Sequence, residues 1–226
     1  MPQGLPLEFF AWIPQLLHWF VDVVLHLDKH LVQLLGEFGP WVYAILFLIV
    51  FAETGLVVTP ILPGDSLLFA AGALSAVDTS GTLRAPVLSV VLIVAAIGGN
   101  TLNYSIGRAI GPRAFTGRVR FLKVEYLQRT QGFFERYGGM TIVVSRFMPI
   151  IRTFAPFVAG IGQMPYGRFQ FWNVLGGVSW VLLFIWGGYL FGNIPAIKNH
   201  FGIVTIAIVI VSVMPAIVAF FRRKKT

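Results

Sequence analysis

The stretch ETGLVVTPILPGD, residues 53–65, places two carboxylates and two prolines between two apolar runs. The run before it reads PWVYAILFLIVFA, and the run after it reads SLLFAAGAL. Proline inside a helix removes a hydrogen bond and clashes with the preceding turn, so Pro60 and Pro63 end the first helix. The second run is too short to cross a bilayer, which needs about 20 apolar residues. The sequence therefore predicts a span over 41–58 and a re-entrant hairpin over 60–78.

The composition indicates an integral membrane protein. Of the 226 residues, 57% are hydrophobic and 12% are charged, and the mean hydropathy is +0.80. Soluble domains have about a quarter of their residues charged. We expect one membrane domain over residues 1–226. The chain has no cysteine, which excludes disulfides and thiolate chemistry. No Lys or Arg precedes Lys29, so the N-terminal residues do not have the charge pattern of a signal peptide and we expect them to be retained.

The positive charge is concentrated in two places. The net charge is +8, and seven of the 17 basic residues lie in the segment 108–138. Four more are in the terminal sequence RRKKT. Basic residues beside apolar spans mark cytoplasmic loops and contact anionic headgroups, so we expect membrane lipids rather than nucleic acid as partners. The segment 108–138 is predicted to be a cytoplasmic loop with a short amphipathic helix over 124–137.

Further apolar runs complete the set of membrane segments. Those over 86–107, 169–191 and 202–221 are predicted to be ordinary spans. The run 140–161 is interrupted by two arginines and two prolines, and it is predicted to be a second re-entrant hairpin. The residues expected to shape the two hairpins are Pro60, Pro63, Gly64, Pro149 and Pro156.

The segment 14–37 is predicted to be an amphipathic helix in the membrane interface, because polar residues recur every three or four positions. His26 and His30 are spaced as metal ligands can be on a helix, but a solvated polar stripe is the favoured interpretation. No other residues complete a metal site, and we expect no metal and no cofactor.

The basic segments fix an orientation. With 108–138 and the C-terminus cytoplasmic, the first hairpin enters from outside, the second enters from the cytoplasm, and the N-terminus is also cytoplasmic. Two broken segments that enter from opposite faces are typical of inverted repeats in transporters. The predicted fold is therefore an all-α polytopic membrane protein, an inverted repeat with two re-entrant hairpins and an N-terminal amphipathic helix.

Four charged residues fall in the broken segments: Glu53, Asp65, Arg146 and Arg152. Each would cost about 2.5–3.5 kcal/mol at the centre of a lipid-facing helix. They are therefore expected to face protein or a polar cavity, and one another. A structural ion-pair cluster is one interpretation, and a functional site is the favoured one.

The arginines and the carboxylates suit different tasks. A break at Pro149 would let Arg146 and Arg152 converge on one anion, with the planar donors that suit phosphate or carboxylate. That anion is either a substrate or one of the two acids. A buried carboxyl group can bind and release a proton, so Glu53 and Asp65 are candidates for proton coupling.

A polar face lies on the span 86–107 and just beyond it. Its residues either line a cavity or pack against neighbouring helices. They are Asn100, Asn103, Tyr104 and Arg108.

Three motifs in order carry a family resemblance: FAETGLVVTPILPGDSLLFAAGAL, GGNTLNYSIGR and FFERYGGMTIVVSRFMPIIRTFAPFVAG. Over about residues 15–195 the chain resembles the DedA family, also described as SNARE-associated or VTT-domain membrane proteins. The resemblance implies a polytopic bacterial inner-membrane protein with two re-entrant hairpins, and lipid translocation, notably of undecaprenyl phosphate, that depends on the proton motive force. Related eukaryotic proteins are lipid scramblases.

The resemblance also implies that the four buried charges are the functionally required set. One position departs from the family pattern. Relatives commonly have Gly-Asp where this chain has Gly99 and Asn100, and an asparagine does not titrate. If that position binds the coupling proton elsewhere, this chain relies on Glu53 and Asp65 or couples differently.

The favoured function is a transporter or flippase for an anionic lipid, in which the arginines bind the phosphate and the acids handle protons. Alternatives are a phospholipid scramblase or flippase, a proton-coupled cation antiporter, and a structural or assembly protein. An enzyme is not expected, because lipid phosphatases need histidines near their basic residues and Asp65 has no neighbouring aspartates for a metal. The sequence is compatible with a homo-oligomer.

Overall fold

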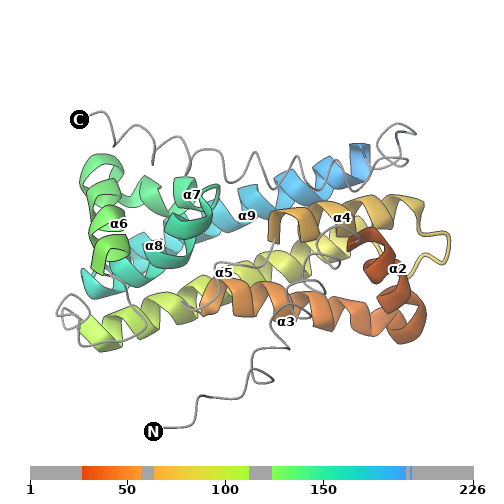
Figure 1. Cartoon of the computed structure of the whole chain (residues 1–226), viewed down its shortest axis with the longest axis horizontal. Coiled ribbons are helices and arrows are strands. Elements are labelled where there is room, and N and C mark those ends of the chain that lie inside the picture. The colour runs from red at the N-terminus through yellow and green to blue at the C-terminus, as the bar shows by residue number, and fades with distance from the viewer. Residues whose placement is uncertain (1–26, 57–63, 112–123, 192–193, 195–226) are drawn as a thin grey trace, which may run out of the picture.

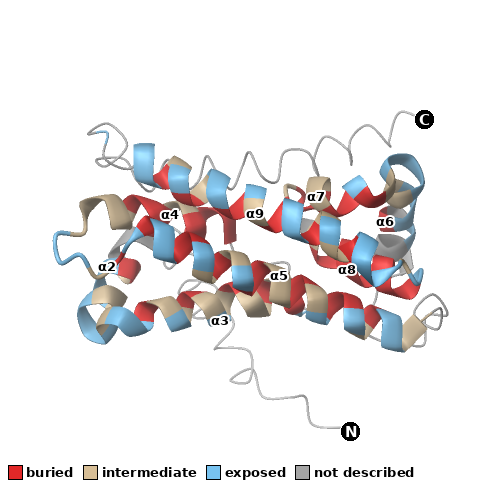
Figure 2. Cartoon of the chain, turned by 180° about the vertical axis from the view of Figure 1, so that it is seen from behind, coloured by how far each residue is buried: buried red, intermediate tan, exposed pale blue. Residues whose placement is uncertain are grey.

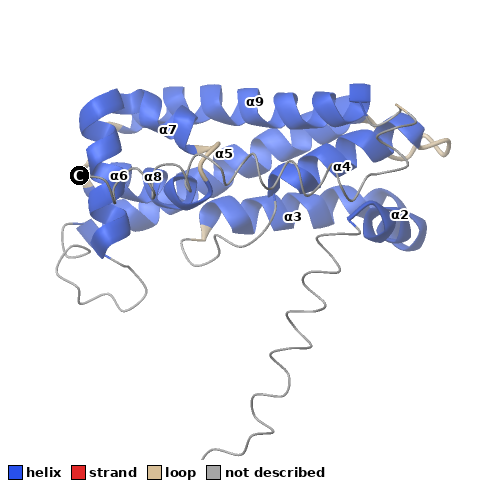
Figure 3. Cartoon of the chain, turned by 45° about the horizontal axis from the view of Figure 1, so that its top comes forward, coloured by secondary structure: helices blue, strands red, loops and turns tan. Residues whose placement is uncertain are grey.

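Helices make up all the regular structure in the described part of the chain. The computed structural model describes residues 27–56, 64–111 and 124–191, together with residue 194. Most helices run along one long axis and form an elongated bundle, with no strand in these ranges (Figure 1, Figure 3). The predicted all-α class is confirmed.

The helices follow a similar order in two halves of the chain. Each half starts with a short amphipathic helix and a 3₁₀ turn, continues through two helices of at most 14 residues, and ends in a helix of 26 residues. The first half contains α2 (Leu27–Phe38), η2 (Gly39–Trp41), α3 (Val42–Gly55), α4 (Gly64–Val77) and α5 (Ala85–Ile110). The second half contains α6 (Val124–Tyr137), η4 (Gly138–Met140), α7 (Thr141–Ser145), α8 (Pro149–Ile161) and α9 (Tyr166–Phe191).

The same backbone turn opens both 3₁₀ segments. Gly39 and Gly138 have φ angles of 52° and 57°. Side chains other than glycine rarely adopt this left-handed conformation, so glycine ends the amphipathic helix and redirects the chain. The predicted helix over 124–137 is confirmed as α6. The interfacial helix predicted over 14–37 is observed as α2 from Leu27 onward, and its earlier part lies outside the described residues.

Three helical stretches are long and apolar enough to cross a membrane: His30–Gly55, Ala85–Ile110 and Tyr166–Phe191. The last two contain the spans predicted over 86–107 and 169–191. The first includes the turn at Gly39, so its straight part is α3, which is about 21 Å long at 1.5 Å per residue. The segment 202–221 lies outside the described residues, as do Pro60 and Pro63.

The two predicted hairpin segments each contain a short helix. α4 has 14 residues and α8 has 13, too few to cross a bilayer. Both are largely buried within the bundle (Figure 2). Their placement as re-entrant hairpins, and the inverted repeat, stay predictions.

The short helix of each half packs on the long helix of the other half, α4 on α9 and α8 on α5. Glycines let the backbones approach closely in the first pair. A side chain added at Gly72 would overlap the backbone of Ile185, and one added at Gly188 would overlap the backbone of Phe69.

The second pair repeats this geometry with the same spacing. A side chain at Gly160 would overlap the backbone of Tyr104, and one at Gly107 would overlap the backbone of Phe157. In both pairs the short helix supplies Phe-x-x-Gly and the long helix supplies a glycine three residues after its contact residue. The two halves are therefore interlocked through matching joints.

The outside of the bundle is apolar. Large hydrophobic side chains such as Leu48, Val90, Phe171 and Leu183 are exposed along the long helices. The buried faces turn inward in Figure 2. Since a soluble protein rarely exposes so much apolar surface, this outer face suits hydrocarbon.

Candidate functional site

Three of the four predicted charges meet directly. Arg152 of α8 donates a hydrogen bond from Nη1 to Asp65 Oδ1 at 3.0 Å and another from Nη2 to Glu53 Oε1. Glu53 lies near the end of α3 and Asp65 in the first turn of α4, and both side chains are buried. We call these three residues the triad. The triad joins the two halves of the chain, as the sequence predicts.

Local backbone breaks position the triad. Asp65 follows Gly64 at the start of α4, where the N-terminal end of the helix favours a negative charge. A side chain added at Gly64 would overlap the Glu53 carboxylate where it now lies. The glycine of the sequence PGD therefore leaves room for this carboxylate beside the start of α4.

Arg146 is buried beside the triad but has a different environment. Only 4% of it is exposed, and its Nη2 donates to Asn173 Oδ1 at 2.9 Å and to the Asn173 carbonyl at 3.4 Å. Its Nε is buried without a hydrogen-bond partner. Within the described ranges no carboxylate pairs with it. Arg146 is therefore a buried cation held by a neutral amide.

The predicted break separates the two arginines. α7 ends at Ser145, Met148 is extended, and Pro149 opens α8. Arg146 lies before this break and Arg152 lies after it, so the two side chains converge without sharing one helix face. Pro156 lies inside α8 and donates no backbone hydrogen bond to Arg152.

Two residues of α9 connect the arginines, and sequence reasoning missed both. The indole Nε1 of Trp180 donates to Asp65 Oδ1 at 2.9 Å. The guanidinium carbons of Arg146 and Arg152 each lie 5.8 Å from the centre of a Trp180 ring. Asn173 is seven residues earlier, which is two helical turns, so it projects from the same face of α9. A polar residue in an apolar span was the signal that could have identified Asn173.

The predicted polar face of α5 has two roles. Asn100 donates to Asn173 Oδ1 at 3.1 Å, and it therefore belongs to the network around Arg146. Asn103 donates to the carbonyls of Thr153 and Thr54 and ties α5 to α8 and α3.

Tyr104 and Arg108 lie away from the charges. Tyr104 donates its hydroxyl to the Met164 carbonyl, and Arg108 donates to the Tyr104 hydroxyl at 3.4 Å. Their contacts are those of helix packing. Of the four cavity-lining candidates, only Asn100 lines the space beside the charges.

The space left among the charges is very small. A cavity of about 10 Å³ is lined by Glu53, Thr54, Asn100, Arg146, Arg152, Thr153 and Trp180. A single water needs about 10–15 Å³. The site is therefore closed in this arrangement and has no room for a phosphate group. Among the described residues, no group of three His, Cys, Asp or Glu side chains is placed to hold a metal.

These features define a class: a helical membrane protein in which two broken segments bring opposite charges together in the apolar interior. In a comparison with known protein families, residues 62–190 of the chain match the VTT domain. The chain therefore belongs to the DedA family of VTT-domain membrane proteins, and the resemblance read from the sequence is confirmed.

The relatives are similar over most of their length. The chain is 47% identical over 211 residues to the protein DedA of Escherichia coli strain K12, which covers 93% of this chain and 96% of that one. It is 42% identical over 188 residues to an uncharacterized membrane protein of Mycobacterium tuberculosis strain H37Rv, covering 83% and 82%. It is 36% identical over 183 residues to the inner membrane protein YghB of Escherichia coli strain K12, covering 80% and 79%. No solved structure matches the chain.

Proposed function

We propose that this protein translocates an anionic lipid across the inner membrane, that undecaprenyl phosphate is its substrate, and that the proton motive force drives the movement. The observation that carries the proposal is Arg146, a buried cation with no carboxylate partner in the described structure, placed next to an arginine that has two. A buried cation of this kind has a strong preference for an anion. The name of the relative YghB supports an inner-membrane location.

The charges explain how a proton and an anion would bind together. Two carboxylates share Arg152, so the triad has one negative charge when both acids are ionised. Arg146 contributes one positive charge, and the four residues are then neutral in sum. A proton on Glu53 or Asp65 makes the sum positive, which favours a phosphate. It also weakens one ion pair of Arg152, and the guanidinium becomes available as a second donor to the anion.

The closed cavity requires a conformational change before a phosphate can enter. We propose that the two matched joints, α4 on α9 and α8 on α5, are where the halves move relative to each other. We call the triad together with Arg146 the charge cluster. In an inverted repeat such a movement would open the charge cluster to one face of the membrane and then to the other. The orientation proposed from the basic segments places both termini in the cytoplasm.

The alternatives differ in ligand and coupling. A phospholipid scramblase or flippase would use the same arginines for a different headgroup. A cation antiporter is less well supported, because Arg152 occupies both carboxylates and Arg146 adds a further positive charge. Like charges repel, so a metal or alkali cation would bind poorly there.

The test is a headgroup-accessibility assay in proteoliposomes that contain either undecaprenyl phosphate or phosphatidylethanolamine, with and without a pH gradient. We expect faster translocation of undecaprenyl phosphate with the gradient, and its loss in Arg146→Gln. Arg84→Gln is the matched control, because Arg84 is exposed in the loop between α4 and α5. Equal rates for both lipids without a gradient would instead assign scrambling. No translocation of either lipid by the folded protein would reject the proposal.

A further inference from the structure

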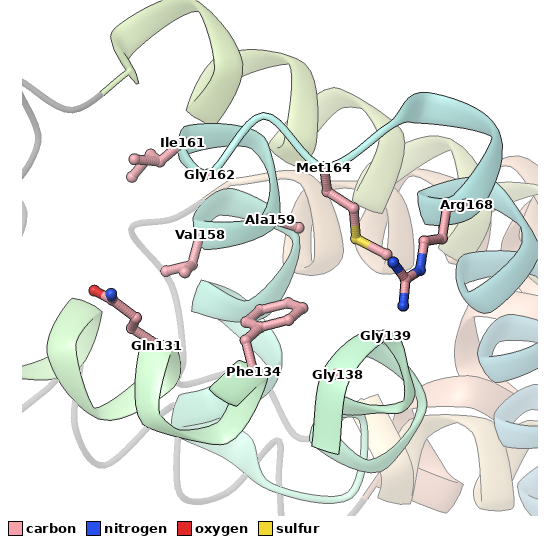
Figure 4. A pocket seen from close by; sticks show the side chains of 10 residues that line it. All are labelled: Gln131, Phe134, Gly138, Gly139, Val158, Ala159, Ile161, Gly162, Met164 and Arg168. Atoms are coloured by element: carbon pink, nitrogen blue, oxygen red, sulfur yellow. The ribbon is translucent and has the colours of Figure 1, made fainter. Parts of the chain in front are cut away.

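A second cavity lies at the end of the bundle where α6, η4, the end of α8 and the start of α9 meet. We call it the terminal pocket. Its volume is about 430 Å³, against about 10 Å³ for the space in the charge cluster. The two cavities share no lining residue. The terminal pocket is lined by Gln131, Phe134, Gly138, Gly139, Val158, Ala159, Ile161, Gly162, Met164 and Arg168 (Figure 4).

The lining combines an apolar wall with a cation. Eight of the ten residues are apolar or glycine, and the two polar side chains are Gln131 and Arg168. Figure 4 shows Phe134, Met164 and Arg168 pointing toward the space beside Gly139. No acidic residue is among the ten. A volume of this size and a mostly apolar lining with a few polar groups are typical of small-ligand sites.

The position of Arg168 suits a lipid headgroup. It is the third residue of α9, a helix of 26 residues that is about 39 Å long. A hydrocarbon core is about 30 Å thick, so the first turn of α9 would lie near the headgroup level when α9 spans it. Arg168 is exposed, whereas Val158 and Ile161, which lie at the opposite side of the pocket in Figure 4, are buried. A ligand in the pocket would therefore have its charge outward and its chain inward.

We propose that the terminal pocket binds an anionic amphiphile with a single phosphate group, with Arg168 contacting the phosphate and the apolar wall holding the start of the hydrocarbon chain. This site is separate from the charge cluster and open in the arrangement in which the cluster is closed. It extends the proposed function, because it would hold a lipid phosphate before the cluster admits it. The binding itself does not depend on translocation.

The probe is dodecyl phosphate with a diazirine in its chain. It is added to the whole chain, held either in nanodiscs of phosphatidylcholine or in micelles of a detergent with an uncharged headgroup. We expect saturable labelling of peptides from 131–139 and 158–168. An excess of dodecyl phosphate should compete, and neither dodecanol nor inorganic phosphate should, because the pocket needs both the chain and the charge. Competition by dodecanol as strong as by dodecyl phosphate would overturn the proposal, since an apolar crevice alone would then explain binding. If inorganic phosphate by itself competed with the probe, the pocket would be a site for free phosphate, and the proposal of a lipid ligand would be overturned.

Two variants test the contributions of the Arg168 charge and of the cavity volume to binding separately. Arg168→Gln should weaken binding about tenfold or more, as expected for a lost charged hydrogen bond. Val158→Trp should fill the pocket and weaken binding with the charge intact. Arg136→Gln is the control, because Arg136 is exposed at the end of α6 and does not line the pocket. Unchanged binding in both Arg168→Gln and Val158→Trp would overturn the proposal.

A further variant, Arg146→Gln, distinguishes this inference from the proposed function. Arg146→Gln should leave dodecyl phosphate binding at the terminal pocket unchanged while it abolishes translocation. Binding at the pocket by a protein that translocates no lipid would reject the proposed function and keep the pocket. Translocation that depends on Arg146, without labelling of the terminal pocket, would overturn the pocket proposal and keep the proposed function.

Discussion

Trp180 donates its indole N–H to Asp65 at 2.9 Å, across 115 residues of sequence and between the two halves of the protein. The same indole lies against both Arg146 and Arg152. It therefore holds one acid and two cations of the charge cluster in fixed relative positions. Its role is to position the charged groups.

The first prediction removes the indole N–H. Trp180→Phe keeps an aromatic ring for the arginines and removes one hydrogen bond to Asp65, so we expect a loss of about 1 kcal/mol in unfolding free energy. Trp180→Leu also removes the ring and should cost more. Thermal unfolding in detergent measures both. Trp186→Phe, at an exposed position of the same helix, should be nearly neutral. Equal stability of Trp180→Leu and the native protein would contradict the positioning role.

The second prediction concerns the pairing inside the cluster. Removing one partner of a buried ion pair leaves an uncompensated charge and costs about 3–5 kcal/mol. Arg152→Gln leaves both Glu53 and Asp65 without their cation, so we expect it to be partly rescued by Glu53→Gln, which removes one of the two stranded carboxylates. Glu53→Gln should not rescue Arg146→Gln, because Arg146 contacts an amide and not Glu53. Unfolding free energies of the single and double variants give the coupling energies, and a larger coupling for Arg146 than for Arg152 would contradict the observed pairing.

The third prediction tests whether the unpaired charge of Arg146 attracts the substrate. Asn173→Asp places a carboxylate where Arg146 now contacts an amide oxygen, at nearly constant volume. The variant gives a buried cation a counter-ion, and this offsets the loss of the hydrogen bonds that the Asn173 amide donates to the Ile97 carbonyl and to Gln170 Oε1, so we expect it to fold. It should bind undecaprenyl phosphate at least tenfold more weakly, because the anion's place is taken.

Binding of undecaprenyl phosphate to the purified protein is the measurement for this variant. The control is Asn173→Gln, which adds length and no charge. If Asn173→Asp binds the lipid as tightly as the native protein does, Arg146 is not the anion site.

Much of the site could be predicted from the sequence because burying a charge is costly. Glu53, Asp65, Arg146 and Arg152 stand out in apolar segments, and prolines near them indicate where the helices break. The same argument applies to Asn173, which lies in the apolar run of α9. The repeated sequences FAAG and FVAG, at residues 69–72 and 157–160, could have indicated the matching joints.

Other features depend on tertiary packing and leave no sequence signal. A tryptophan in an apolar span is ordinary, so nothing distinguishes Trp180 before the fold is known. Arg146 and Arg152 are equivalent in sequence, and only the tertiary arrangement, in which Arg152 of α8 reaches Glu53 of α3 and Asp65 of α4, gives Arg152 both carboxylates. The terminal pocket forms between α6, the end of α8 and the start of α9. The hydrophobic pattern of each helix does not specify how these helices are placed relative to one another.

The fourth prediction concerns pH and the loop between α4 and α5. The Asp78 carboxylate accepts hydrogen bonds from the Ser80 hydroxyl and backbone N–H and from the Leu83 N–H, and these lower the pKa of Asp78. A lowered pKa in the folded state stabilises the loop above the unfolded value of about 3.9. The stabilisation is lost as the pH falls below that value through the folded pKa.

Hydrogen exchange of the Leu83 amide measures this effect. Protection should be high at pH 6 and reduced at pH 3 after correction for the intrinsic exchange rate. Asp78→Asn should make the protection independent of pH over this range, whereas the exposed Thr79→Ala should not. A native pH dependence in Asp78→Asn would assign the effect to another group.

The last prediction tests the joint between α4 and α9 with two adjacent glycines. A Cβ at Gly188 would overlap the backbone of Phe69, whereas one at Gly187 would meet only the ring edge of Phe69 at 4.0 Å. Gly188→Ala should therefore separate the helices and cost about 1–3 kcal/mol, the usual range for overpacking. Gly187→Ala should be neutral or slightly stabilising, because alanine is favoured over glycine in a helix. Gly107→Ala, at the matching joint of α5 with α8, should behave like Gly188→Ala because its Cβ would overlap the backbone of Phe157. Thermal unfolding of the three variants is the measurement, and equal stability of Gly188→Ala and Gly187→Ala would show that the helices are not held at this close approach.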